Sequence, residues 1–271
     1  MKLAFFGDVV GRAGRKAISK YVPNLRDSLG LDAVVVNAEN AAGGFGITPS
    51  TANELFDAGV DMLTLGNHSF DNAAGISLIE NDTRVLRPCN YPKGQMPGRG
   101  AGLLEVGGYR LLVINVLGRV YMDALDDPFI AVQRELDAAP LGMVADAVLV
   151  DVHAEASSEK QGMGYFCDGV ASLVVGTHTH TPTSDTRILP QGTAFQTDAG
   201  MCGDYNSIIG MEPEEPLRRF TTRMRGGRFQ PASGAPTLCG VFVQTDDKTG
   251  LAVRVEPIRM GGALIEAVPE L

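Results

Sequence analysis

The sequence of 271 residues contains no tryptophan, four widely spaced cysteines and no apolar run long enough to span a membrane. The cysteines form no Cys-x-x-Cys pair, which argues against a disulfide framework or a thiolate zinc site and favours reduced thiols. The apolar run from Leu3 to Phe6 is too short for the core of a signal peptide. We therefore expect a cytoplasmic protein without a membrane-spanning segment.

Positive charge is also scarce. Lys and Arg together number 23 against 32 Asp and Glu, so the formal net charge is −9. Bulk electrostatic attraction to nucleic acid or to an anionic membrane is therefore not expected. A small anionic substrate would need locally concentrated positive charge, which bound metal ions could supply. The sequence does not fix the oligomeric state and is compatible with a homo-oligomer.

Short apolar runs alternate with helical patterns in the first third of the chain. The predicted strands are Lys2 to Asp8, Ala33 to Asn37 and Asp61 to Leu65. Between the first two strands, apolar residues recur at helical spacing, and we expect Pro23 to kink or interrupt that helix. Thr48 and Pro49 are a typical helix start. This alternation predicts parallel βαβ units.

The later part of the chain predicts a mixed sheet. Gly107-Gly108 separates two apolar runs and predicts a hairpin with a primed turn. A second hairpin is expected between Leu238–Gln244 and Leu251–Ile258. The span from Pro213 to Pro236 is rich in Arg, Gly and Pro and is interpreted as a surface excursion. With no linker and no repeat, we expect one domain over residues 1–271.

Polar side chains follow the predicted strands. His178 and His180 come after the apolar run from Leu173 to Val175, which we expect to end at Gly176. In an extended segment residues i and i+2 point the same way, so both imidazoles could reach one point. Ligands bind beyond the carboxyl ends of strands in open α/β sheets. The candidate residues at these positions are Asp8, Glu39, Asn40, Asn67, His68, His153, His178 and His180.

This mixture of carboxylate, amide and imidazole groups suits Mn, Fe, Zn or a mixed site with Mg, and not a thiolate site. Eight groups are too many for one four-coordinate ion. Two metals that share a bridging carboxylate would use seven and leave one group for proton transfer in phosphoryl chemistry. The alternative is that each histidine is a separate core or loop residue with a satisfied hydrogen bond.

These residues lie in motifs that resemble the calcineurin-like metallophosphoesterases, and among them the YmdB-like branch of bacterial 2′,3′-cyclic-nucleotide phosphodiesterases. The motifs are Gly7-Asp8, Asn37-Ala-Glu-Asn40, Gly66-Asn-His-Ser-Phe-Asp71, Asp151-Val-His-Ala-Glu155 with Glu159-Lys160, and Gly176-Thr-His-Thr-His180. The resemblance implies a four-layer α-β-β-α sandwich with two central mixed sheets. The sequence departs from the superfamily at Val10, where a histidine is usual, and at Glu39, where the bridging residue is usually Asp.

The resemblance also implies how the ligands divide. One metal would bind Asp8, Glu39, Asn40 and His180, with Asn40 compensating for the missing histidine. The other would bind Glu39, Asn67, His153 and His178, so that Glu39 bridges the two. Fe and Mn are the expected metals, two ions per chain. His68, which Asp71 could orient, would be the general acid that protonates the leaving oxygen.

The implied reaction is hydrolysis of a small phosphodiester, a 2′,3′-cyclic nucleotide such as cyclic AMP, by a hydroxide that bridges the two metals. Three alternatives remain open at this point. The same site could serve a phosphomonoesterase. An amidohydrolase-type enzyme would usually carry His-x-His on its first strand, whereas this first strand ends in Asp8. The chain could also be a regulatory protein that binds a metal or nucleotide with little turnover.

Overall fold

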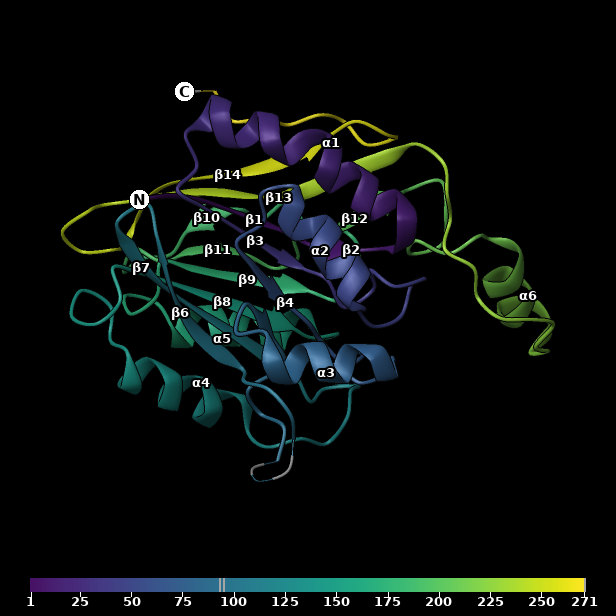
Figure 1. Cartoon of the computed structure of the whole chain (residues 1–271), viewed down its shortest axis with the longest axis horizontal. Coiled ribbons are helices and arrows are strands. Elements are labelled where there is room, and N and C mark those ends of the chain that lie inside the picture. Colours follow the sequence, from purple (N-terminus) through teal and green to yellow (C-terminus); the bar gives the residue numbers. More distant parts are fainter. Residues whose placement is uncertain (93, 95, 271) are drawn as a thin grey trace.

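The protein is described by a computed structural model that covers residues 1–92, 94 and 96–270, and its strands form two mixed sheets (Figure 1). The larger sheet has the order β2 (Asp8–Val9), β12 (Met201–Asp204), β13 (Pro236–Thr245), β1 (Lys2–Phe6), β3 (Ala33–Asn37), β4 (Met62–Thr64) and β5 (Val85–Leu86), with β14 (Ala252–Met260) beside β13. The smaller sheet has the order β10 (Arg187–Ile188), β11 (Ala194–Gln196), β9 (Leu173–Thr177), β8 (Ala147–His153), β7 (Tyr109–Leu117) and β6 (Ala101–Val106). The helices are α1 (Gly11–Leu29), α2 (Pro49–Asp57), α3 (Ala73–Asn81), α4 (Pro128–Ala138), α5 (Ser157–Phe166) and α6 (Glu214–Thr222).

The predicted parallel and antiparallel parts are both confirmed. Strands β1, β3, β4 and β5 run parallel in the larger sheet, and β7, β8 and β9 do so in the smaller one. The β6–β7 hairpin turns at Gly107 and Gly108, whose φ values of 59° and 84° are those that a primed turn requires. Strands β13 and β14 form the second predicted hairpin.

Three large hydrophobic clusters hold these elements together, and a small fourth one contains Val10, Met201 and Met211. The first joins the larger sheet to α1, α2 and α3, and the second joins the smaller sheet to α4 and α5. The third contains Phe5 and Val35 from the larger sheet and Val113 and Leu149 from the smaller one. All four of these side chains are fully buried. The two sheets therefore share one apolar core, which fixes the position of their strand ends relative to each other.

Pro23 does not interrupt α1, which excludes one of the two effects expected from the sequence; the other, a kink, stays a prediction. The helix runs from Gly11 to Leu29, and its buried face carries Ile18, Val22 and Leu25. Pro23 and Ser19, whose carbonyl loses its usual partner, both lie on the exposed face. Water can therefore hydrogen-bond the freed carbonyl, which reduces the penalty of a proline inside a helix.

The prediction that Gly176 ends its strand was also wrong. Strand β9 continues to Thr177, and Gly176 and Thr177 pair with Val152 and His153 of β8. A side chain at Gly176 would collide with the Thr197 carbonyl and with Lys160, so only glycine allows this close packing. The surface excursion predicted from Pro213 to Pro236 contains a helix, α6, that the sequence did not suggest; Figure 1 shows it set apart from both sheets. In the part of the chain that the structure describes, no helix is long and apolar enough to cross a membrane.

Candidate metal centre

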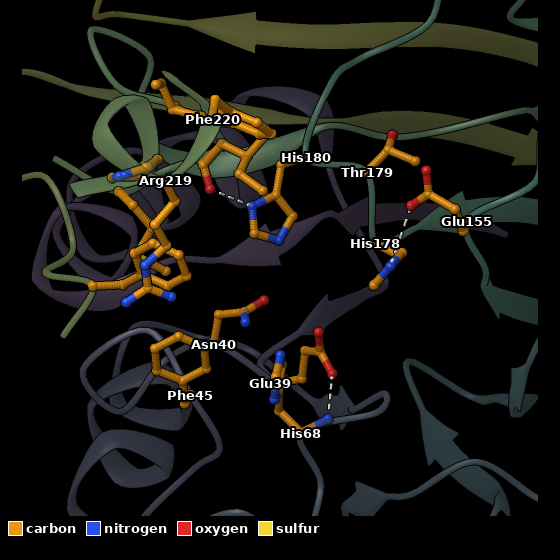
Figure 2. Close-up of a pocket in the computed structure, with 15 residues that line it drawn as sticks. Glu39, Asn40, Phe45, His68, Glu155, His178, Thr179, His180, Arg219 and Phe220 are labelled. Atoms are coloured by element: carbon orange, nitrogen blue, oxygen red, sulfur yellow. Dashed lines mark hydrogen bonds and ion pairs between the residues drawn. The ribbon is translucent and has the colours of Figure 1, made fainter. Parts of the chain in front are cut away.

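The candidate residues gather where the strand ends of the two sheets meet. Asp8 begins β2, Glu39 and Asn40 follow β3, and Asn67 and His68 follow β4, all from the larger sheet. His153 ends β8, and His178 and His180 follow β9 in the smaller sheet. Figure 2 shows Glu39, Asn40, His68, His178 and His180 directed toward one pocket. The predicted residues are thus close together in space.

The tightest group surrounds the Nε2 atom of His153. This atom lies 3.0 Å from Glu39 Oε1, 3.0 Å from Asn67 Oδ1 and 3.1 Å from His178 Nδ1. One ligand atom each from Glu39, His153 and His178 lies within 4.8 Å of the other two. Imidazole nitrogens with carboxylate and amide oxygens form a donor set that suits a first-row transition metal.

Hydrogen bonds determine which nitrogen of His153 is free to bind a metal. The hydroxyl of Thr177 donates to Asp151 Oδ1 at 2.7 Å, so its oxygen is left to accept from His153 Nδ1 at 2.9 Å. The proton of neutral His153 therefore resides on Nδ1, and the lone pair of Nε2 faces the group. Asp151 is fully buried and also accepts from Thr64 at 2.5 Å and Asn37 at 3.0 Å. Such outer contacts orient a metal ligand.

The other two histidines of the site are oriented in the same way. His178 Nε2 lies 3.4 Å from Glu155 Oε2, and His180 Nδ1 donates to the Ile209 carbonyl at 2.8 Å (Figure 2). The Ile209 carbonyl accepts the Nδ1 proton of His180, so the free lone pair of His180 is on Nε2. His178 Nδ1 faces His153, and His180 Nε2 lies 3.9 Å from Asp8 Oδ1.

A second group surrounds Asp8, whose Oδ1 lies 3.9 Å from His180 Nε2 and 3.8 Å from His153 Nδ1. Asp8 is fully buried and Asn40 is 3% exposed, yet Asp8 Oδ1 and Asn40 Oδ1 have no hydrogen-bond partner among the described residues. A buried carboxylate or amide oxygen without a donor is strongly disfavoured. A cation bound between these oxygens and His180 Nε2 would satisfy both, so the residues fit the metal that the motifs imply.

The histidine segment is not extended, contrary to the expectation for His-x-His. His178 and His180 have φ values of 96° and 64°, a left-handed conformation that disfavours a side chain by about 1–2 kcal/mol. The buried Asp198 holds the residue between them. Its Oδ2 accepts from the Thr179 amide at 3.2 Å, the Thr179 hydroxyl at 2.7 Å and Lys160 Nζ at 2.7 Å. The twisted backbone lets the two rings reach different partners, His153 and Asp8.

His68 is placed by its backbone as well as by its side chain. Its amide donates to Glu39 Oε2 at 2.9 Å, and a side chain at the preceding Gly66 would overlap the Glu39 carboxylate and the His153 ring. The ring nitrogen Nδ1 lies 2.7 Å from Asp71 Oδ2. Its edge meets Phe45, with ring centroids 5.0 Å apart. His68 therefore lines the pocket in a fixed orientation beside the candidate metal ligands.

The buried charges shift one another's pKa values. Burial raises the pKa of Glu39, but His153 and His68 outweigh it and lower that pKa to about 2. Burial lowers the pKa of His153, but Glu39, Asp8 and Asp151 together raise it to about 9. Burial, together with His153, lowers the pKa of His178 to about 3. Without a metal, a proton on His153 therefore offsets the negative charge of Glu39.

Several residues that position the site were not among the sequence candidates. Asp151, Thr177, Asp198 and the carbonyl of Ile209 contact ligands or their neighbours. For Asp151 a signal existed, because it lies two residues before His153 in a strand and so faces the same side. No local pattern connects Asp198 with Thr179, since their contact depends on the packing of two separate segments.

The pocket above the centre, which we call the main pocket, has a volume of about 500 Å³. Glu39, Asn40, His178 and His180 form its metal side. Its opposite wall comes from the excursion that contains α6 and includes Arg219, Phe220 and Phe229. A pocket of this size is typical of sites for small molecules.

Two mixed sheets that bring carboxylates, amides and histidines together at their strand ends define a metallophosphoesterase-type protein. The chain belongs to the YmdB-like protein family, which it matches over residues 4–258. It is 42% identical over 258 residues to the 2′,3′-cyclic-nucleotide 2′-phosphodiesterase of Bacillus subtilis, covering 95% of this chain and 96% of that protein.

Two crystal structures are similar along nearly the whole chain. A hypothetical protein from Thermus thermophilus is 44% identical with a TM-score of 0.90, covering 97% of this chain and 100% of that one. A protein from Mycoplasma pneumoniae described as a novel phosphatase is 32% identical with a TM-score of 0.89. The match covers 96% of this chain and 93% of that one. Membership of this family implies divalent metals, for which Glu39, His153 and His178 form a candidate cluster.

Metal loading should release a proton near neutral pH. The pKa of His153 lies at about 9 in the metal-free site, so the ring must lose a proton to bind a metal. Apparent Mn²⁺ affinity should therefore rise as the pH rises toward that value. Calorimetric titration in two buffers of different ionisation enthalpy measures the release, and His153→Asn should abolish it. If the unaltered protein gives equal heats in both buffers, no proton is released, which would contradict the assignment of His153 as a metal ligand.

Proposed function

We propose that the chain is a metal-dependent phosphoric diester hydrolase, a single cytoplasmic metallophosphoesterase domain that acts on 2′,3′-cyclic nucleotides such as cyclic AMP. The observation that carries the proposal is the convergence of lone pairs on His153 Nε2, beside the unpartnered oxygens of Asp8 and Asn40. The name of the Bacillus subtilis relative supports the substrate class. The shared core of the two sheets supports the four-layer arrangement of α-β-β-α.

Two ions, Fe or Mn, would be held by two groups of residues that share Glu39. The first group is Asp8, Glu39, Asn40 and His180, and the second is Glu39, Asn67, His153 and His178. Such ions, when bound, neutralise phosphate charge and lower the pKa of water. Glu39 is assigned to the shared position as the motifs imply; its Oε1 lies 3.0 Å from His153, and its Oε2 accepts from the His68 amide.

His68 would act as the general acid. It lines the main pocket next to Asn67, and its Nδ1 is engaged by Asp71, which leaves Nε2 to hold the proton that the leaving oxygen needs. Hydrolysis on the 2′ side breaks the bond between phosphorus and the 2′ oxygen and forms a bond between phosphorus and the oxygen of a water molecule. The proton goes to that oxygen, and the product is a nucleoside 3′-monophosphate. The name of the relative as a 2′-phosphodiesterase supports this direction.

The direct test is incubation of the Mn²⁺-loaded protein with 2′,3′-cyclic AMP, followed by separation of the products. We expect a single product, adenosine 3′-monophosphate. Glu39→Gln should reduce turnover to background because it removes the shared charge while keeping the size of the side chain. Glu80→Gln, an exposed position on α3, should have no effect. No turnover with metal bound, or preferred hydrolysis of the monophosphate, would refute the diesterase.

His68→Asn should lower kcat by about 10²–10⁴-fold, the usual contribution of a general acid. Bound metal, measured by plasma emission spectrometry, should be unchanged because His68 is not assigned as a ligand. The loss should be much smaller with a p-nitrophenyl phosphodiester, whose leaving group needs no proton. An equal loss with both substrates would show that His68 does not protonate the leaving oxygen.

A further inference from the structure

The wall of the main pocket opposite the candidate metal ligands carries aromatic and cationic side chains. Phe45 lies beside His68, and Phe220 of α6 is 77% exposed although it lines the pocket. The guanidinium carbon of Arg219 lies 3.9 Å from the ring centroid of Phe229. Exposed aromatic rings next to a phosphate site are the surfaces on which nucleobases stack.

A second pocket, the arginine pocket, adjoins this wall. It has a volume of about 550 Å³, and Phe45, Arg219 and Phe229 line it as well as the main pocket. Its other cationic side chains are Arg225 and Arg228. The two pockets therefore adjoin at Phe45, Arg219 and Phe229, which places the arginine pocket next to the main pocket.

The segment from position 218 to 228, which lines part of both pockets, is positively charged, whereas the whole protein is negatively charged. Five arginines and no acidic residue lie between positions 218 and 228, in a chain whose net charge is −9. Arg219 is already engaged, because it donates to Glu215 at 2.7 Å and to the Gly227 carbonyl at 2.7 Å. Among the residues that the structure describes, no acidic side chain pairs with Arg225 or Arg228. These two guanidinium groups are available to an anion.

We propose that the arginine pocket binds a second phosphate of the substrate. The preferred substrate is then a nucleotide with a 2′,3′-cyclic phosphate at the metals, its base or sugar at the aromatic wall, and a further phosphate on its 5′ side. Guanidinium groups bind phosphate oxygens in a bidentate manner, which suits this role. This inference rests on the proposed function, because it places the cyclic phosphate at the metals.

The test compares three substrates at equal ionic strength: 2′,3′-cyclic AMP, its 5′-phosphorylated form, and the dinucleotide ApA that ends in a 2′,3′-cyclic phosphate. At least one of the two longer compounds should have a KM lower by about tenfold or more, as expected for charged hydrogen bonds. A lower KM for the 5′-phosphorylated compound would show that the pocket binds a terminal phosphate. A lower KM for the dinucleotide alone would show that it binds the internal phosphate at the end of an RNA strand. If neither compound has a lower KM than 2′,3′-cyclic AMP, the proposal is overturned.

The double variant Arg225→Gln/Arg228→Gln should remove the preference for substrates that carry a second phosphate. Arg218→Gln is the matched control, since it removes a charge from the same segment but lines neither pocket. An unchanged preference in the double variant, or an equal loss in the control, would count against the arginine pocket as the phosphate site.

A binding measurement separates this inference from the proposed catalysis. In calorimetric titrations of the Mn²⁺-loaded protein, adenosine 3′,5′-bisphosphate should bind about tenfold more tightly than adenosine 3′-monophosphate, and the double variant should lose the difference. If 2′,3′-cyclic AMP is not hydrolysed but this difference is present, the diesterase assignment fails and the second phosphate site stands. If the affinities are equal, the second site fails whatever the activity.

Discussion

The site depends on one electrostatic constraint, which is that several buried lone pairs face each other with no neutral donor between them. His153 Nε2 and His178 Nδ1 are 3.1 Å apart, and Glu39 Oε1 and Asn67 Oδ1 lie at a similarly short distance from His153. Such atoms repel one another unless a positive charge lies between them. In the metal-free protein the proton of His153 provides that charge, and in the proposed enzyme metal ions do.

The surrounding fold maintains this unfavourable arrangement. Apolar packing between the sheets fixes the ends of β3, β4, β8 and β9, so the ligands cannot separate without disrupting the core. Asp151 orients His153 through Thr177, and Asp198 holds Thr179 between two histidines with left-handed backbone. Strain of this kind persists where the surrounding contacts over-determine it, and it is concentrated at functional sites.

The framework of the fold could be predicted because its signals are local. Buried strands show as apolar runs, helix starts such as Thr48-Pro49 show in two residues, and Gly107-Gly108 specifies its turn. The proximity of the candidate residues followed from their shared place after strands. Their precise orientation could not be predicted, since the twist at His178 and His180 depends on Asp198, which lies eighteen residues beyond His180 in the sequence. The aromatic wall was missed because α6 contains few apolar residues and, apart from Pro216, buries none of them, so its sequence resembles a surface loop more than a helix.

We propose that two cations share Glu39 where the two sheets meet. The most direct test is anomalous X-ray diffraction at the manganese edge from crystals of the Mn²⁺-loaded protein. We expect two anomalous peaks, one on each side of Glu39. One should lie among Glu39, Asn67, His153 and His178, and the other among Asp8, Glu39, Asn40 and His180. A single peak, or peaks away from Glu39, would contradict it.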